Sequence, residues 1–167
     1  MFEPKRIGRE AVPAALEKAE RYRLRNDPEA AESICLDVLL ADPGNQHAVI
    51  MLLLALTDQM PDAPAELDRR ARLLLPEIRD EYRRAYYAGV ICERHAKVYL
   101  HANAPGAGEA AYNWLREAME HYEQAERMRP AGNDEAILRW NTCARLLARD
   151  EVHVHPRSEE RYEPTYD

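Results

Sequence analysis

The 167-residue sequence has little of what β-sheets and membrane spans need. It contains 6 Gly and a single Phe, and Val, Ile and Thr are sparse beside Ala, Leu, Glu and Arg, which favours helix over strand. The best apolar run, "AVIMLLLAL" at 48–56, is half of the roughly 18 residues needed to span a membrane. The N-terminal "MFEPKRIGREA" has basic residues with no apolar stretch behind them, so we expect no secretory signal and no membrane span.

Cysteine is also scarce, and no motif for catalysis or metal binding is present. Cys35, Cys92 and Cys143 lie far apart within helical apolar patterns, which indicates buried free thiols in a reducing, cytoplasmic location. His95 and His101 are six residues apart and lie on different faces of one helix, and no Asp, Glu or Cys completes a cluster with them. Phosphate loops, Gly-x-Ser-x-Gly and His-Glu-x-x-His are missing. We therefore expect no metal, no cofactor and no enzymatic activity.

The net charge of −7 is unevenly distributed along the chain. Residues 26–68 contain nine acids and no Lys or Arg, whereas residues 69–101 carry eight bases against four acids. Blocks of opposite sign predict electrostatic contacts within the fold or with a partner, the alternative being solvated helix faces. The basic stretch 69–87 contains the Arg and Tyr that nucleic-acid binders use, but acids interrupt it and the chain is acidic, so nucleic-acid binding is disfavoured.

Proline, glycine and asparagine divide the chain into helices. "NDPE" at 26–29 supplies a helix start, and "PGNQHA" at 43–48 and "AGNDEA" at 131–136 each stop one helix with Gly and start the next with Asn. This punctuation predicts an all-α fold of about seven helices: 9–25, 28–41, 46–59, 64–75, 77–102, 109–128 and 134–149.

Two of these helices carry matching seams of mostly small residues. Steps of four and three residues connect Ile78, Tyr82, Ala85, Gly89, Cys92, Ala96 and Tyr99 on one helix and Ala111, Leu115, Ala118, Tyr122 and Ala125 on the next. Such seams on consecutive helices predict one extended antiparallel αα-hairpin.

The prolines that end helices recur along the chain. Pro43 and Pro76 are 33 residues apart, and Pro130 follows after 54, which corresponds to one helix-hairpin unit with longer helices. The predicted units are about 12–45, 46–78 and 79–132, followed by a closing helix 134–149. Together they form a single domain, 1–150, and an acidic C-terminal tail occupies 151–167.

Small and large residues at fixed spacing before these prolines resemble the tetratricopeptide repeat (TPR). The residues that carry the resemblance are Ala19, Tyr22, Ala31, Cys35, Val38 and Pro43 in the first unit, and Ala118, Tyr122, Ala125 and Pro130 in the long unit. The resemblance implies a right-handed helix-hairpin solenoid in which the first helix of each unit lines a concave, peptide-binding groove. In such a fold the small residues let antiparallel helices approach closely.

A stripe opposite the seam of helix 77–102 is the candidate binding surface. It contains Arg83, Tyr87, Val90, Arg94, Lys97 and His101, and by the TPR resemblance it faces the groove, flanked by Arg23, His47, Asn141 and Arg145 from the other first helices. Arg and Tyr together suit an extended acidic peptide, because the guanidinium pairs with carboxylates and Tyr is a rigid anchor. A solvated or helix-covered face is the alternative.

The sequence thus predicts a non-catalytic protein–protein interaction module, with a chaperone or scaffold role. A nucleic-acid-associated helical-repeat protein and an accessory subunit of an enzyme are the alternatives. The partner is a protein or peptide of acidic character; the tail 151–167 is itself an acidic segment that could dock on the stripe of its own or a neighbouring chain. Homodimerisation through an exposed apolar surface on 46–59 is also left open.

Overall fold

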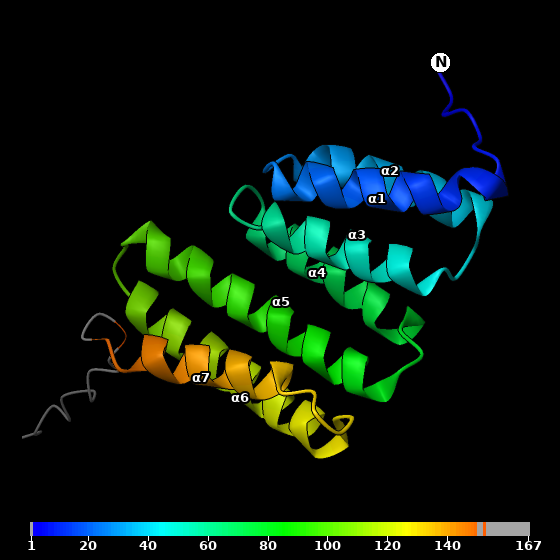
Figure 1. Ribbon diagram of the computed structural model, residues 1–167. Helices are drawn as coiled ribbons and strands as arrows, with labels where there is room; N and C mark the ends of the chain where they lie inside the picture. Colours follow the sequence, from blue (N-terminus) through cyan, green and yellow to red (C-terminus); the bar gives the residue numbers. More distant parts are fainter. Residues whose placement is uncertain (1, 150–151, 153–167) are drawn as a thin grey trace, which may run out of the picture.

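A computed structural model describes residues 2–149 and residue 152, and within these residues the chain forms seven α-helices and no strand (Figure 1). The all-α prediction is confirmed for this part of the chain. The helices are α1 (Val12–Leu24), α2 (Pro28–Ala41), α3 (Gln46–Asp58), α4 (Pro64–Leu74), α5 (Glu81–Ala102), α6 (Ala107–Met128) and α7 (Glu135–Leu147). Short 3-10 turns, Arg9–Ala11 and Leu75–Glu77, precede α1 and follow α4. None of the described helices combines the length and the apolar character that crossing a membrane requires.

Side-chain caps fix the helix starts that the sequence indicated. The Asp27 carboxylate accepts from the Ala30 amide at 3.3 Å, and the Asn45 side chain accepts from the Ala48 amide at 2.9 Å. Gly44, just before Asn45, has φ = 77°, a left-handed conformation in which glycine carries no steric penalty. These contacts explain why the boundaries of α2 and α3 could be predicted from the sequence.

Four starts differ from the prediction. Helix α1 begins three residues late, after the Arg9–Ala11 turn, α6 begins two residues early at Ala107, and α5 and α7 begin four residues and one residue late. The helix expected from residue 77 begins at Glu81, because the Asp80 carboxylate accepts from the Arg83 amide at 2.8 Å and so caps the helix there. Ile78 lies in extended backbone before it and is fully buried. At α7 the cap position is Asp134, whereas the Asn133 side chain accepts from the Glu135 amide at 3.1 Å and from the Tyr82 hydroxyl at 3.2 Å.

The helices pack mainly against their neighbours in sequence. Helices α1 and α2, α3 and α4, and α5 and α6 form three consecutive hairpins, and α7 packs on α6 (Figure 1). The α5–α6 hairpin has the most extensive contact, and its seam is buried as predicted, apart from the half-buried Tyr99. In addition, α2 packs on α3, which joins the first two hairpins.

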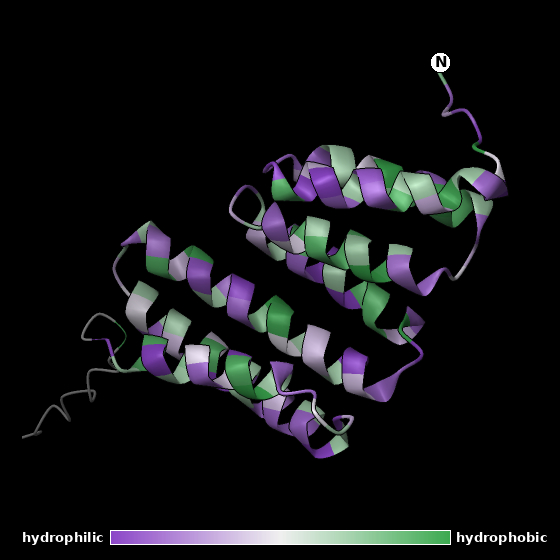
Figure 2. Ribbon diagram, viewed as in Figure 1, coloured by the Kyte–Doolittle hydropathy of each residue, from purple (hydrophilic) through white to green (hydrophobic). Residues whose placement is uncertain are grey.

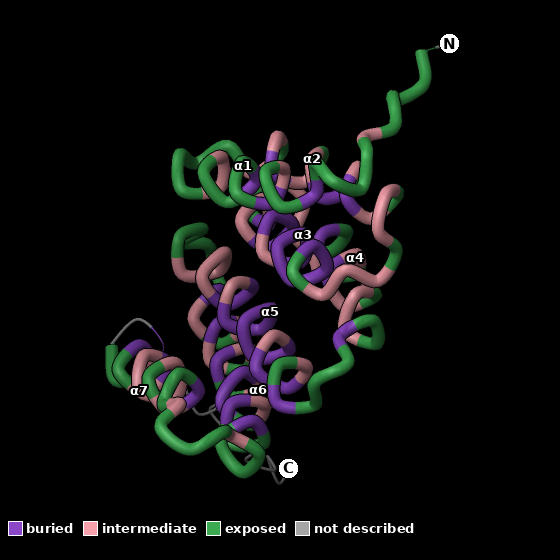
Figure 3. Tube along the Cα trace, turned by 45° about the vertical axis from the view of Figure 1, so that its right-hand side comes forward, coloured by how far each residue is buried: buried purple, intermediate pink, exposed green. Residues whose placement is uncertain are grey.

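Burial concentrates in α3, α5 and α6, while about half of α1 is exposed and most of α7 is half-buried (Figure 3). Figure 2 shows that α3 is largely hydrophobic, and nine of its thirteen residues are buried. Among the described residues, the large hydrophobic side chains that are exposed all lie outside 46–59. The dimer contact considered for that segment therefore has no exposed apolar face to use. Val152, beyond α7, is fully buried against the α5–α7 core.

Helix α5 packs directly against α6 at Gly89. A Cβ at this position would lie 2.6 Å from Cε1 of Tyr122, much closer than the roughly 3.5–4.0 Å at which carbon atoms pack. Gly89 is thus required by the fully buried Tyr122 ring, and not by a special backbone angle.

Ion pairs connect the acidic block 26–68 to the basic residues on either side of it. Arg9 pairs with Asp42 at 2.9 Å and Arg70 pairs with Glu32, which ties the start of the domain and α4 to α2. Asp58, at the end of α3, receives Arg23 from α1 at 2.6 Å and Arg94 from α5 at 3.5 Å. Several of the charges in the acidic block therefore pair with arginines within the fold, which is one of the two kinds of contact that the charge pattern predicted.

The three cysteines are free, fully buried thiols. Burial raises the pKa of Cys35, Cys92 and Cys143 to about 12 each, so at neutral pH all three are protonated and unreactive. We expect a thiol reagent such as Ellman's reagent to label none of them rapidly in the native protein and all three in denaturant. Rapid labelling of one thiol in the native state would contradict this burial.

Candidate functional site

A groove of about 670 Å³ lies where α1, α3, α5 and the start of α7 meet. The lining residues of α3, from His47 to Leu54, are three or four positions apart or adjacent, so they lie on one face of that helix. The lining residues of α5 are two adjacent pairs separated by one helical turn, and they also lie on one face. The lining residues are Glu20, Arg23, His47, Ile50, Met51, Leu54, Tyr82, Arg83, Tyr86, Tyr87, Asn133 and Glu135.

Three tyrosines form one wall of this groove. The ring centroids of Tyr82 and Tyr86 are 6.1 Å apart and nearly parallel, and Tyr87 meets Tyr86 edge-on at 5.1 Å. The Tyr82 hydroxyl donates to Asn133, and the Tyr86 hydroxyl accepts from Nε of Arg139 at 3.3 Å. In the described part of the chain, the Tyr87 hydroxyl has no hydrogen-bond partner. Burial raises the pKa of Tyr87, so this hydroxyl remains a protonated donor at neutral pH.

The charges in the groove are mixed. Arg23 is held by Asp58, and Glu20 and Glu135 are also among the lining residues. Arg83 is exposed, and among residues 2–149 and 152 its guanidinium takes part in no ion pair or hydrogen bond. Arg83 is therefore the cation in this groove that is open to a partner.

The residues of the predicted stripe lie in three different parts of the structure. Arg23, His47, Arg83 and Tyr87 come together in the groove. Arg94, Lys97 and His101 line a second cavity farther along α5. Val90 is only 1% exposed and belongs to the core, so it cannot contact a ligand directly.

The two predicted residues of α7 lie away from the groove. Asn141 lines a different cavity together with Trp140 and side chains of α6, because α7 packs on α6 and turns this face toward it. Arg145 is exposed four residues farther along the helix. Arg139 of α7, which was not predicted, reaches α5 and contacts Tyr86 and Glu93.

Glu93 is a buried charge that the sequence analysis missed. Its carboxylate is 1% exposed and accepts from the Tyr122 hydroxyl at 2.7 Å, from Nζ of Lys97 at 2.5 Å and from Nη1 of Arg139 at 3.2 Å. Burial by itself would raise the pKa of Glu93, but the hydrogen bonds from Lys97 and Tyr122 and the nearby Arg139 hold it below its usual value. Because Arg139 also contacts Tyr86, this network connects the core of the α5–α6 hairpin to the groove. The one sequence signal was the i, i+4 spacing of Glu93 and Lys97.

The structure also gathers Cys92, Glu117 and His121, whose potential ligand atoms all lie within 4.8 Å of one another. Glu117 and His121 are four residues apart on α6, a pair that was not predicted. Nη2 of Arg72 lies 3.5 Å from both the Cys92 sulfur and a Glu117 oxygen. The positively charged Arg72 guanidinium is therefore already in contact with two of these three residues. Arg72 is held there by Asp68 at 2.9 Å and lies over the Trp114 ring.

Half of the arginines in the basic stretch 69–87, considered for nucleic acid, are engaged in the fold. Arg70 pairs with Glu32, Arg72 pairs with Asp68, and Arg84 donates to the carbonyl of Ile78 at 2.7 Å. Arginines held in this way are not free to follow a phosphate backbone.

Comparison with known proteins adds no further constraint: no family model, no curated protein and no solved structure matches this chain. The tail hypothesis concerns residues 151–167, which lie outside the described residues apart from Val152. What the described chain offers is the groove, with aromatic faces, aliphatic side chains, one unpaired guanidinium and one unpaired hydroxyl.

Proposed function

We propose that this protein is a TPR-like helical-repeat module that binds a segment of a protein partner in the groove between α1, α3 and α5. In this proposal it is a non-catalytic, cytoplasmic chaperone or scaffold, and the helix hairpins form a right-handed solenoid.

The packing supports the TPR-like part of the proposal. Ala19, Ala31, Ala118 and Ala125, small residues at the positions that carry the resemblance, are all 0% exposed, as expected where antiparallel helices approach closely. Gly89 packs directly against the ring of Tyr122, another residue of the same pattern. The first helix of each hairpin contributes to the groove, as the resemblance requires.

The single observation that carries the binding proposal is the pair Arg83 and Tyr87. They lie four residues apart on α5, both line the groove, and both have donors that no described residue uses. Helix α3 supplies Ile50 and Leu54 to the same groove. A partner segment with a carboxylate beside an aromatic or aliphatic side chain fits this set, because Arg pairs with carboxylates and Tyr anchors apolar groups.

The groove favours a single acidic residue in the partner segment. Glu20 and Glu135 would repel a uniformly acidic peptide, whereas Arg83 is open to a single carboxylate. We therefore expect partner segments in which one Asp or Glu lies next to apolar residues.

Peptide display against the whole protein tests this proposal. Selected peptides should contain that combination, and their affinity, measured by fluorescence anisotropy, should fall about tenfold or more with Arg83→Glu, because one charge-assisted contact is lost and a repulsion replaces it. Arg116→Glu makes the same charge change on an exposed position of α6 and should leave the affinity unchanged. Equal losses with both variants, or no loss with Arg83→Glu, would refute the groove as the binding site.

A further inference from the structure

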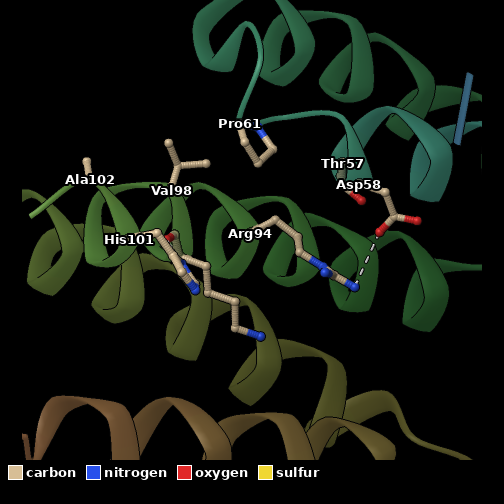
Figure 4. A pocket seen from close by; sticks show the side chains of 8 residues that line it. Thr57, Asp58, Pro61, Arg94, Val98, His101 and Ala102 are labelled. Atoms are coloured by element: carbon tan, nitrogen blue, oxygen red, sulfur yellow. Dashed lines mark hydrogen bonds and ion pairs between the residues drawn. The ribbon is translucent and has the colours of Figure 1, made fainter. Parts of the chain in front are cut away.

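A second cavity, of about 390 Å³, lies between the α3–α4 connection and the C-terminal half of α5 (Figure 4). Its lining residues are Thr57, Asp58, Pro61, Arg94, Lys97, Val98, His101 and Ala102. Pro61 and Val98 face each other across the opening and Ala102 lies beyond them, which gives one apolar side (Figure 4). Arg94 and Lys97, one turn apart on α5, give the cavity its cationic side.

The Arg94 guanidinium has N–H donors without acceptors. Its ion pair with Asp58 spans 3.5 Å from Nη2 to Oδ1, and within residues 2–149 and 152 it makes no hydrogen bond. Its Nε is buried and has no partner at all. Arg has five N–H donors, and the Arg94 side chain is 31% exposed, so an acceptor can reach the Nη donors that Asp58 does not use.

The carboxylates that pair with Arg94 and Lys97 are each shared with a second cation. Asp58 accepts from Nε of Arg23 at 2.6 Å and also faces Arg94. Likewise, one oxygen of Glu93 receives both Lys97 at 2.5 Å and Arg139 at 3.2 Å. Four cations thus share two carboxylates, and two of these cations, Arg94 and Lys97, line the cavity, where an anion would reduce the repulsion between them.

We propose that this cavity binds a small organic oxyanion, a carboxylate or phosphate group on a short apolar body. The oxyanion accepts from the unused donors of Arg94 and pairs with Lys97, and the apolar body packs on Pro61, Val98 and Ala102. The volume is near the lower end of the range of about 300–1,000 Å³ for ligand pockets, which suits a small molecule. His101 donates from Nδ1 to the Lys97 carbonyl at 2.6 Å, which leaves Nε2 unused at the rim. This site goes beyond the proposed peptide groove and does not depend on it.

The test is NMR titration of the full chain, following the Nε–H signal of Arg94 and the backbone amides of 57–61 and 94–102. The probes are benzoate, phenyl phosphate and benzamide, the neutral isostere of benzoate. We expect saturable shifts with at least one of the two oxyanions and none with benzamide, and the better oxyanion distinguishes carboxylate from phosphate.

Matched variants connect the shifts to the cavity. Arg94→Gln should weaken binding about tenfold or more, the loss expected for hydrogen bonds to a charged group. Arg94→Lys keeps the charge beside Asp58 but loses the paired donors, so it should also weaken binding; it replaces Arg94→Gln if that variant does not fold. Arg83→Gln, in the groove, should leave oxyanion binding unchanged, which separates this proposal from the peptide site.

Three results would overturn the proposal. They are the absence of saturable shifts with both oxyanions, equal shifts with benzamide, and unchanged affinity in a folded Arg94 variant.

Discussion

Replacing Glu93 with Gln should lower the free energy of unfolding by about 3 kcal/mol, within the range of about 3–5 kcal/mol for breaking a buried ion pair. The carboxylate is 1% exposed and faces Lys97, Arg139 and the Tyr122 hydroxyl. Glutamine preserves the shape but leaves two cations without their counter-charge. We expect the lower end of the range because the side chains of Lys97 and Arg139 are each about one-third exposed and can still reach water.

Urea unfolding followed by circular dichroism measures this loss. Glu120→Gln removes a carboxylate from an exposed position of α6 and is the matched control, with an expected change within about 0.5 kcal/mol. A loss for Glu93→Gln no larger than that of the control would show that the network does not stabilise the fold.

The pH dependence of the same pair of proteins gives an independent test. The pKa of Glu93 in the folded protein lies below its usual value, so the unfolded chain binds a proton more readily than the folded one. The contribution of Glu93 is therefore fully present above the unfolded value of about 4.3 and is lost as the pH falls through the folded value. The stability difference between wild type and Glu93→Gln should be largest near pH 7 and shrink below about pH 4. A difference that stays constant across this range would contradict the assignment.

Replacing Gly89 with Ala should destabilise the protein by about 2–3 kcal/mol, although alanine favours helix by about 1 kcal/mol. The new Cβ would lie 2.6 Å and 2.7 Å from Cε1 and Cδ1 of Tyr122. That ring cannot easily move, because its hydroxyl is bound to Glu93 and Tyr86 packs against it at 5.8 Å.

A double-mutant cycle with Tyr122→Leu identifies the cause. In the Tyr122→Leu background, Gly89→Ala should be neutral or slightly stabilising, because the clash is gone and the helix propensity of alanine remains. An equal loss in both backgrounds would mean that a contact other than the Tyr122 ring requires glycine at this position.

The helices were predictable because their signals are local. The side chains of Asp27 and Asn45 cap helices by accepting from amides three residues away. The alternating steps of four and three residues in α5 and α6 predict which face of each helix is buried against the other. The start of α5 was predicted four residues early because proline and acidic residues at 76–81 are compatible with several starts. Only the observed contact between Asp80 and the Arg83 amide selects one of them.

The candidate site was only partly predictable, because helix periodicity gives the direction of a side chain but not its partner. Spacing put Arg83 and Tyr87 on one stripe, the TPR resemblance implied that this stripe faces a groove, and both residues do line one. Val90 has the same spacing but is covered by neighbouring helices. Glu93 falls between the seam and the stripe, and its partner Arg139 is 46 residues away, so no local pattern marks the network.

The α5–α6 hairpin has a consequence for how the chain folds. Its two 22-residue helices are joined by only four residues, 103–106, so bringing them together closes a short loop at little entropic cost. Contacts between sequence neighbours form early, whereas α1 and α2 reach the rest of the chain mainly through α3. We therefore expect the hairpin to form early in folding, and the slowest amide hydrogen exchange to be found along its seam, with faster exchange toward α1.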